Sequence, residues 1–146
     1  MKNSHHDDRG VFAELVKSGE PTFQPILQTS YAETYPGVVK AFHWHKRQWD
    51  IWAIVKGSAR VVLHDLRKDS KTSDGTQVIY AGEKDMNVIA IPPGVAHGYQ
   101  VLGDSAMGII YHTSEAYDPK NLDEERIPFD DPAIGFDCTA KEDTHS

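Results

Sequence analysis

Short apolar runs rich in β-branched residues recur along the chain. Turn sequences such as Lys56-Gly57-Ser58, Ser73-Asp74-Gly75 and Pro92-Pro93-Gly94 separate them at intervals typical of strands in a sandwich or barrel. The runs predict strands over Val38–Phe42, Ile51–Val55, Ala59–Leu63, Gln77–Tyr80, Val88–Ile91, Tyr99–Leu102 and Met107–Tyr111. We therefore predict an all-β fold, a jelly roll or small antiparallel β-barrel.

Helical periodicity is almost absent. Val11–Lys17 and Asn121–Arg126 are the segments in which a short helical turn is expected. A length of 146 residues fits one domain with a core of its own, so we predict a single domain over residues 1–146. Its acidic end, about residues 138–146, is expected to be an irregular tail.

The alternation around residue 43 predicts which side chains share a face. In a strand, Phe42, Trp44 and Lys46 lie on one side, whereas His43 and His45 lie on the other. Inward polar groups are costly unless they line a wet or occupied pocket. This strand is therefore expected to border a ligand site inside the barrel.

Composition narrows the function classes. The formal net charge of -7 disfavours a partner as acidic as nucleic acid. The single cysteine, Cys138, excludes an intrachain disulfide framework. No signal peptide and no membrane-spanning run is visible, so a cytoplasmic protein is expected. The acidic segment near Asp123 and the C-terminal tail are interpreted as solvated surface.

Histidines give the strongest chemical signal. His43 and His45 belong to the pattern G-x5-H-x-H-x4-D-x6-G, which runs from Gly37 to Gly57, and His97 ends the block that begins at Pro92. A Pro-Gly turn about one strand pair later can bring His97 beside the other two rings. Imidazoles that converge in one pocket serve either proton transfer or metal binding.

These blocks resemble the cupin superfamily, and six ordered motifs resemble the dTDP-4-dehydrorhamnose 3,5-epimerase family within it, from Asp8 to about Asp137. The family has D-x-R-G or D-R-G, an aromatic residue and Glu, then Q-x-N-x-S, L-R-G-L-H, D-L-R-x-x-S-P-T, I-P-x-G-F-A-H-G-F, and Y-x-x-x-x-x-Y-x-P with W-N-D-P-x-I-G. The matching segments start at Asp8, Gln28, Val39, Asp65, Ile91 and Tyr111, and the last motif continues at Phe129.

The resemblance implies a cupin-type jelly roll and an epimerase that inverts C3, C5 or both in a nucleotide-linked 4-keto-6-deoxyhexose. His43 would be the general base, Asp131 its partner and Tyr111 the acid on the opposite face. Such enzymes belong to deoxysugar and polysaccharide biosynthesis. The residues implied for substrate binding are Arg9, Phe12, Glu14, Gln28, Lys40, His45 and His97, of which Arg9, Lys40 and His97 would hold the diphosphate.

The resemblance also implies a homodimer whose segment Asp8–Glu14 reaches the partner's site, and no tightly bound organic cofactor. Two positions depart from the family. Lys40 stands where the family has arginine, so a bidentate phosphate clamp becomes a point charge. Asp50 stands where the family has a lysine that stabilises the enolate, and a carboxylate cannot do this.

Three other readings stay open. Asp50 completes a metal set with His43, His45 and His97, as in metal-dependent cupins, and a divalent ion there would replace the missing lysine. The run Phe42-His43-Trp44-His45-Lys46 also resembles F-H-A-H-K of the dTDP-sugar 3,4-ketoisomerases, in which the ketone moves. A third reading is a non-catalytic barrel with structural histidines. We take the epimerase as the principal hypothesis, with no metal.

Overall fold

The computed structural model describes residues 4–135, which form three antiparallel sheets. A two-stranded sheet pairs β1 with β2, a four-stranded sheet has the order β3-β10-β5-β8, and a five-stranded sheet has the order β11-β4-β9-β6-β7. The strands are β1 (Ser4–Asp7), β2 (Gly10–Ala13), β3 (Gln28–Thr34), β4 (Val39–Trp44), β5 (Asp50–Lys56), β6 (Ser58–Asp65), β7 (Thr76–Gly82), β8 (Val88–Ile91), β9 (Val95–Leu102), β10 (Met107–Thr113) and β11 (Glu125–Arg126).

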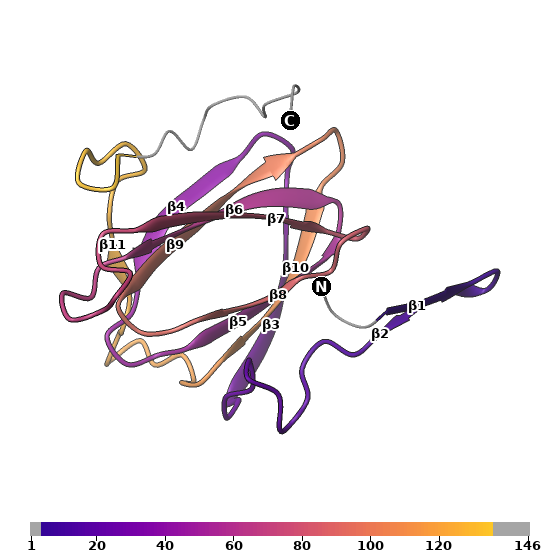
Figure 1. The fold of residues 1–146 in the computed structure, drawn as a ribbon, viewed down its shortest axis with the longest axis horizontal. Coiled ribbons are helices and arrows are strands. Elements are labelled where there is room, and N and C mark those ends of the chain that lie inside the picture. The colour runs from indigo at the N-terminus through magenta and orange to yellow at the C-terminus, as the bar shows by residue number, and fades with distance from the viewer. Residues whose placement is uncertain (1–3, 136–146) are drawn as a thin grey trace.

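The two larger sheets lie one over the other, while the β1–β2 hairpin, here called the arm, projects from the body (Figure 1). The predicted all-β jelly roll is thus confirmed, and each of the seven predicted apolar strands is present. The described residues include no helix with the length and hydropathy that a bilayer-crossing helix needs.

Neither predicted helical turn forms. Val11–Ala13 belongs to β2, and Glu125–Arg126 forms β11, which pairs with Trp44 and His43 of β4. Helix nucleation is costly in such short segments, and pairing with a neighbouring strand satisfies the same backbone groups. The expected tail at about 138–146 lies outside the described residues.

Alternation along β6 and β9 separates two apolar clusters. Val61 and Val95 point between the sheets into the main core, whereas Val62 and Ala96 point to the outer face of the five-stranded sheet. Ile134 and Ile127 of the C-terminal segment cover this outer face together with Phe42. The C-terminal segment is thereby fixed beside β4, which is the strand that carries His43.

The loop after β6 explains one of the sequence motifs. The buried carboxylate of Asp65 accepts hydrogen bonds from the backbone N, Nε and Nη2 of Arg67 and from the hydroxyl of Thr72. Gly94, with φ of +84°, packs against Arg67, and an added Cβ there would lie 2.7 Å from its Cγ. The motif from Asp65 to Thr72 therefore serves the fold, because it holds the turn before His97 in place.

Candidate active site

A cavity of about 630 Å³ opens between the two larger sheets. Its walls come from β3, β4, β5, β9 and β10 and from the segment 115–124. This volume is typical of small-molecule sites. The sequence-predicted site residues that line it are Gln28, Lys40, His43, His45, His97 and Tyr111.

His43 lies near the end of β4, directly opposite His97 of β9. A register shift between Lys40 and His43 breaks the strict alternation, so both side chains line the cavity although they are three residues apart. Gly98 permits this close approach, because an added Cβ would collide with the side chain of Ala41. The expectation that His43 and His45 face one concavity is confirmed.

The carboxylate beside His43 belongs to Glu124. Its Oε1 lies 3.1 Å from Nδ1 of His43, within ion-pair distance although the two groups are not aligned as a hydrogen bond. Burial lowers the pKa of His43, and Glu124 offsets this only in part while the Arg126 cation lowers it further. The ring is therefore mainly neutral near pH 7, which is the form that accepts a proton.

Asp131, the partner predicted for His43, is elsewhere. Its carboxylate accepts a hydrogen bond from the backbone N of Ala133, within the turn that ends at Gly135. No hydrogen bond or ion pair joins it to His43 within the described residues, and it does not line the cavity. The physical reason is the pairing of β11 with β4, which puts the residue just before β11 beside His43.

His45 is held by the segment that precedes β11. Its Nδ1 lies against the main-chain carbonyl of Asp123. The carboxylate of Asp123 accepts hydrogen bonds from the backbone N of Lys46, Arg47 and Gln48 at 2.8, 2.8 and 3.0 Å. Burial works to raise the pKa of Asp123, but these three N–H groups hold it below its usual value. The loop after His45 is therefore fixed by the segment that precedes β11.

His97 lies deep in the cavity and is only 3% exposed. Its Nδ1 lies 3.1 Å from the carbonyl of Val95, and the ring packs edge-on against Trp52 with centroids 5.2 Å apart. Burial lowers the pKa of His97, and Asp50 opposes this only in part. The structure thus places a mainly neutral, buried ring at this position, and the role of His97 in holding the diphosphate stays a prediction.

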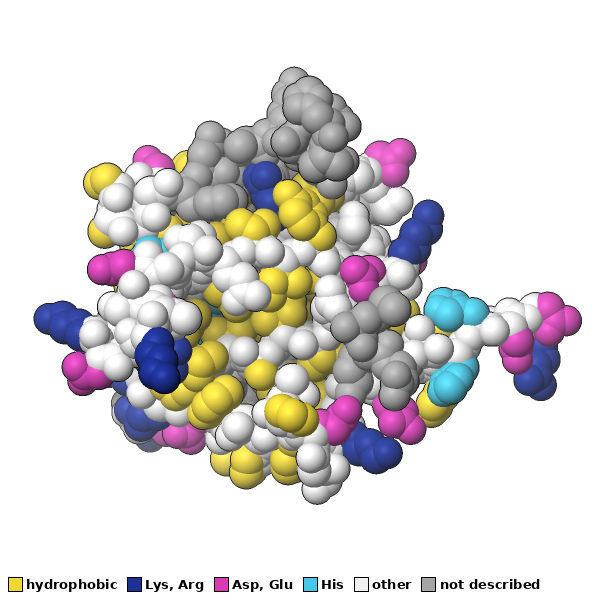
Figure 2. All heavy atoms as spheres, in the orientation of Figure 1, with side chains coloured by type: hydrophobic (Ala, Val, Ile, Leu, Met, Phe, Trp, Pro, Cys, Tyr) yellow, Lys and Arg dark blue, Asp and Glu magenta, His cyan; other side chains and the backbone are white. Residues whose placement is uncertain are grey.

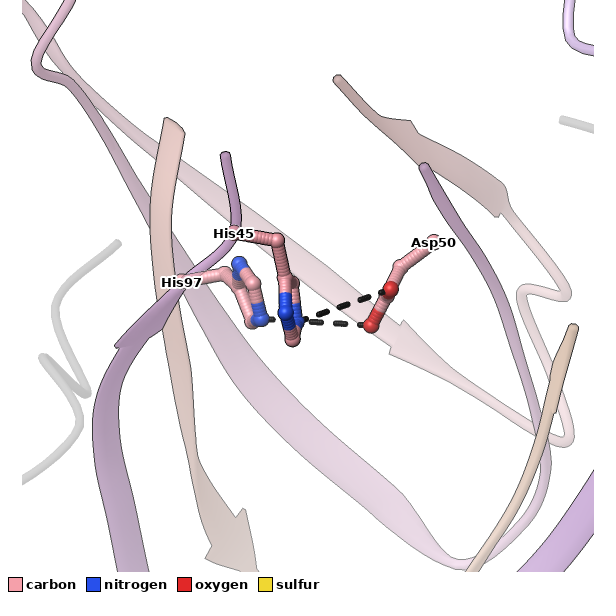
Figure 3. A group of neighbouring side chains, drawn as sticks. All are labelled: His45, Asp50 and His97. Carbon is pink, nitrogen blue, oxygen red and sulfur yellow. Dashed lines mark ion pairs between the residues drawn. The ribbon is translucent and has the colours of Figure 1, made fainter. Parts of the chain in front are cut away.

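Three nearly buried groups meet at the base of the cavity: His45, Asp50 and His97 (Figure 3). The Nε2 atoms of the two histidines lie 3.7 and 3.9 Å from the carboxylate oxygens of Asp50. One donor atom from each of the three residues falls within 4.8 Å of the others. His43, the fourth member of the predicted metal set, is not part of this group.

Tyr111 faces the cavity from the opposite wall. It lies on β10 of the four-stranded sheet, paired with Trp52, whereas His43 lies on the five-stranded sheet. Gln28, on the adjacent β3, also borders the cavity and accepts a hydrogen bond from the backbone N of Tyr117. A ligand in the cavity would therefore lie between His43 and Tyr111.

The arm residues Arg9 and Phe12 and the neighbouring Glu14 do not line the cavity of their own chain. Arg9 pairs with Asp7 at 2.8 Å, and Phe12 is 62% exposed. The arm extends away from the body with its histidine and charged side chains exposed (Figure 2). The structure of one chain therefore leaves this part of the predicted substrate site unassembled.

Sequence reasoning missed the acidic segment. Asp123 and Glu124 were interpreted as solvated surface, yet both line the cavity and hold the histidines in place. Their composition is that of an ordinary exposed turn, and the informative feature is the pairing of the next two residues with β4. That pairing has no local sequence signature.

Comparisons with known proteins give a consistent result. Residues 1–146 match the family described as dTDP-4-dehydrorhamnose 3,5-epimerase. The spore coat polysaccharide biosynthesis protein SpsL of Bacillus subtilis (strain 168) is 52% identical over 132 residues, which cover 90% of this chain and 87% of SpsL. The probable low-salt glycan biosynthesis epimerase Agl13 of Haloferax volcanii is 36% identical over 137 residues, covering 92% and 88%.

Solved structures agree on the fold. A dTDP sugar isomerase from Desulfovibrio desulfuricans G20 superposes with a TM-score of 0.88 at 24% identity, covering 100% of this chain and 92% of the other. The dTDP-4-dehydrorhamnose 3,5-epimerase of Sulfolobus tokodaii gives a TM-score of 0.74 at 31% identity, covering 85% and 72%. The sheets described above are thus those of these sugar-nucleotide enzymes.

Proposed function

The chain belongs to the dTDP-4-dehydrorhamnose 3,5-epimerase family, and on that premise we propose that it inverts C3, C5 or both in a 4-keto-6-deoxyhexose linked to a nucleoside diphosphate. It is an isomerase of the dTDP-sugar epimerase type. The observation that carries the proposal is the placement of His43 and Tyr111 on opposite walls of one cavity.

The proposed reaction begins at a carbon beside the ketone. Nδ1 of His43 is buried against Glu124, so Nε2 is the nitrogen that takes the proton. The C–H bond breaks, its electron pair enters the enolate, and His43 becomes an imidazolium. The hydroxyl of Tyr111 then protonates the same carbon from the other face, so the centre is inverted.

Glu124 is proposed to be the positioning residue for His43. A carboxylate 3.1 Å from Nδ1 fixes the ring orientation and stabilises the positive charge that forms when Nε2 takes the proton. This is the role that the sequence assigned to Asp131. Glu124 is about half exposed, so solvent screens the interaction and its contribution is modest.

We also propose that the protein is a homodimer, as the sequence predicts. The strand order leaves one edge of β3 unpaired in the described structure, and the arm carries the exposed side chains of Val11 and Phe12. An unpaired edge and an exposed hairpin on the same chain are complementary, and a two-fold axis would let each arm cover the other chain. This arrangement would bring Arg9 and Glu14 toward a partner's cavity.

The first prediction concerns His43 as the base. We expect His43→Asn to slow solvent exchange at C3 and C5 of a dTDP-4-keto-6-deoxyhexose in D2O by about 100- to 10,000-fold, since this is the usual contribution of a general base. Proton NMR would measure the exchange, and a ketone that stays at C4 would distinguish epimerisation from ketone migration. His112→Asn is the matched control, because His112 bonds to Thr29 and does not line the cavity. Unchanged exchange in His43→Asn would falsify this role.

The second prediction separates proton removal from inversion. In Tyr111→Phe, His43 can still remove and return the proton on one face. Exchange is therefore expected to persist, while inverted product falls by about 100-fold or more. NMR of the same reaction measures both quantities. Equal losses of exchange and inversion would show that Tyr111 does not act as the opposite-face acid.

The third prediction tests the Glu124 contact. Glu124→Gln is expected to lower kcat by no more than about tenfold, equal to about 1.4 kcal/mol, and to leave KM unchanged because the imidazolium forms only during the reaction. Glu124→Asp should recover part of the loss. The matched control is Glu125→Gln, since Glu125 pairs with Lys46 rather than with His43. A rise in KM without a fall in kcat contradicts the assignment.

The fourth prediction concerns assembly. Light scattering after gel filtration should show a dimer that Phe12→Glu weakens by more than about 100-fold, because two buried phenylalanines contribute about 1.5 to 3 kcal/mol each. Tyr80→Glu is the control, since Tyr80 is an exposed aromatic residue on β7, an edge strand of the five-stranded sheet rather than part of the arm. A dimer that survives Phe12→Glu but dissociates in Tyr80→Glu places the interface away from the arm.

A further inference from the structure

The base of the cavity holds three polar groups that the proposed proton transfer does not use. Nε2 of His45 and Nε2 of His97 both face the carboxylate of Asp50, at 3.7 and 3.9 Å (Figure 3). The exposed fractions are 9% for His45, 5% for Asp50 and 3% for His97. Buried polar groups are costly without partners, so their convergence requires an explanation.

The backbone contacts identify the nitrogen that carries the proton in each ring. Nδ1 of His45 lies against the carbonyl of Asp123, and Nδ1 of His97 lies 3.1 Å from the carbonyl of Val95. A carbonyl oxygen only accepts, so we assign the proton to Nδ1 in both rings. In a neutral imidazole the other nitrogen, Nε2, then carries a lone pair. Two lone pairs thus point toward an anionic carboxylate.

Asp50 also accepts hydrogen bonds from two donors besides the contacts with these rings. Nε2 of Gln48 donates to Oδ1 at 2.7 Å, and Nε1 of Trp52 donates to Oδ2 at 3.1 Å. The Gln48 amide also lies 3.5 Å from Nε2 of His45, a long contact compared with its bond to Asp50. Outer hydrogen bonds that fix both a carboxylate and the Nδ1–H groups of histidines are the arrangement that orients metal ligands.

We propose that His45, Asp50 and His97 bind one divalent transition-metal ion, through the two Nε2 atoms and the carboxylate. Two ligands about 2.1 Å from an ion at a tetrahedral angle lie about 3.4 Å apart. Nε2 of His45 lies 3.7 Å from Oδ1 of Asp50 and Nε2 of His97 lies 3.9 Å from Oδ2, both within about half an ångström of this value. Two imidazoles and one carboxylate suit Zn²⁺, Fe²⁺, Co²⁺ or Mn²⁺, with the remaining coordination positions open to the cavity.

The proposed metal site is separate from His43, the general base. Nδ1 of His43 faces Glu124, and its ring centroid lies 6.5 Å from that of His97. The sequence allowed a metal set that included His43, whereas the structure assigns His43 to proton transfer and the other three residues to the ion. The functional meaning of this site rests on the proposed epimerase reaction: the ion would polarise the ketone and stabilise the enolate at a place where Asp50 alone would repel it.

The test uses the full-length protein, stripped with a chelator and titrated with Zn²⁺ and Co²⁺ in the absence of sugar nucleotide. Calorimetry should give one ion per chain, and Co²⁺ should produce a visible ligand-field spectrum. Asp50→Asn and His97→Gln should each weaken binding by at least about 100-fold. His6→Gln is the matched control, because His6 is exposed on the arm and its loss should leave affinity and spectrum unchanged.

Folding is checked separately, so that a misfolded variant is not mistaken for a lost ligand. The circular dichroism spectra of the variants should match that of the unmodified protein. Saturating Zn²⁺ should raise Tm in the unmodified protein but not in Asp50→Asn. Binding that survives both Asp50→Asn and His97→Gln, or is lost in His6→Gln, overturns the site. So does the absence of binding in the unmodified protein.

Activity then separates this proposal from the one on which it rests. If solvent exchange runs at full rate in the stripped protein and no Asp50-dependent ion binding is found, the metal site is overturned and the epimerase assignment stays intact. If ion binding depends on Asp50 but the metal-loaded protein shows no solvent exchange, the metal site stays intact and the epimerase assignment is overturned.

Discussion

The cavity depends above all on how one carboxylate is bound. Asp123 accepts the backbone N–H groups of Lys46, Arg47 and Gln48, and so fastens the segment before β11 to the loop after β4. Its own carbonyl receives the ring of His45, and the next residue, Glu124, lies beside His43. A carboxylate that accepts three N–H groups is both ionised and immobile, so one interaction orients two histidines at once.

This arrangement divides the histidines by their environment. His43 is partly exposed and has a carboxylate at Nδ1, so a positive charge on its ring can be stabilised when a proton arrives at Nε2. His45 and His97 instead direct Nδ1 to backbone carbonyls and turn Nε2 toward Asp50. Similar residues two positions apart therefore have different chemistry, because the group that holds Nδ1 differs.

Sequence patterns predicted the strands well because each buried run has its own local signal. Val61 and Val62 alternate between two clusters, as a strand with two covered faces requires. β3 was missed because its sequence, Gln28–Thr34, carries polar side chains among few apolar ones and lies at a sheet edge. β1 was missed and Val11–Ala13 of β2 was assigned to a helical turn, because four-residue strands show too little periodicity to identify.

Local sequence signals also predicted some, but not all, of the residues in the site. His43, His45, His97 and Tyr111 occupy the cavity because strand alternation and motif spacing constrain where such side chains point. Glu124 took the place expected for Asp131, since the approach of the C-terminal segment to β4 is set by β11 pairing and by the packing of Ile134 on the outer face. Contacts between distant segments leave no periodic trace in either segment.

The charge balance of the cavity bears on how a diphosphate would be bound. Within the described residues, two cationic side chains, Lys40 and Arg47, line the cavity together with five carboxylates. Arg47 is already 3.7 Å from Glu115. Such a surface attracts an anion weakly, so a sugar nucleotide requires further positive charge at the mouth. Arg9 lies on an arm that extends from the body of its own chain, and only a second chain could bring that guanidinium to the cavity. In the proposed homodimer, the partner's arm would supply positive charge for the diphosphate, while the ion proposed at His45, Asp50 and His97 would polarise the ketone.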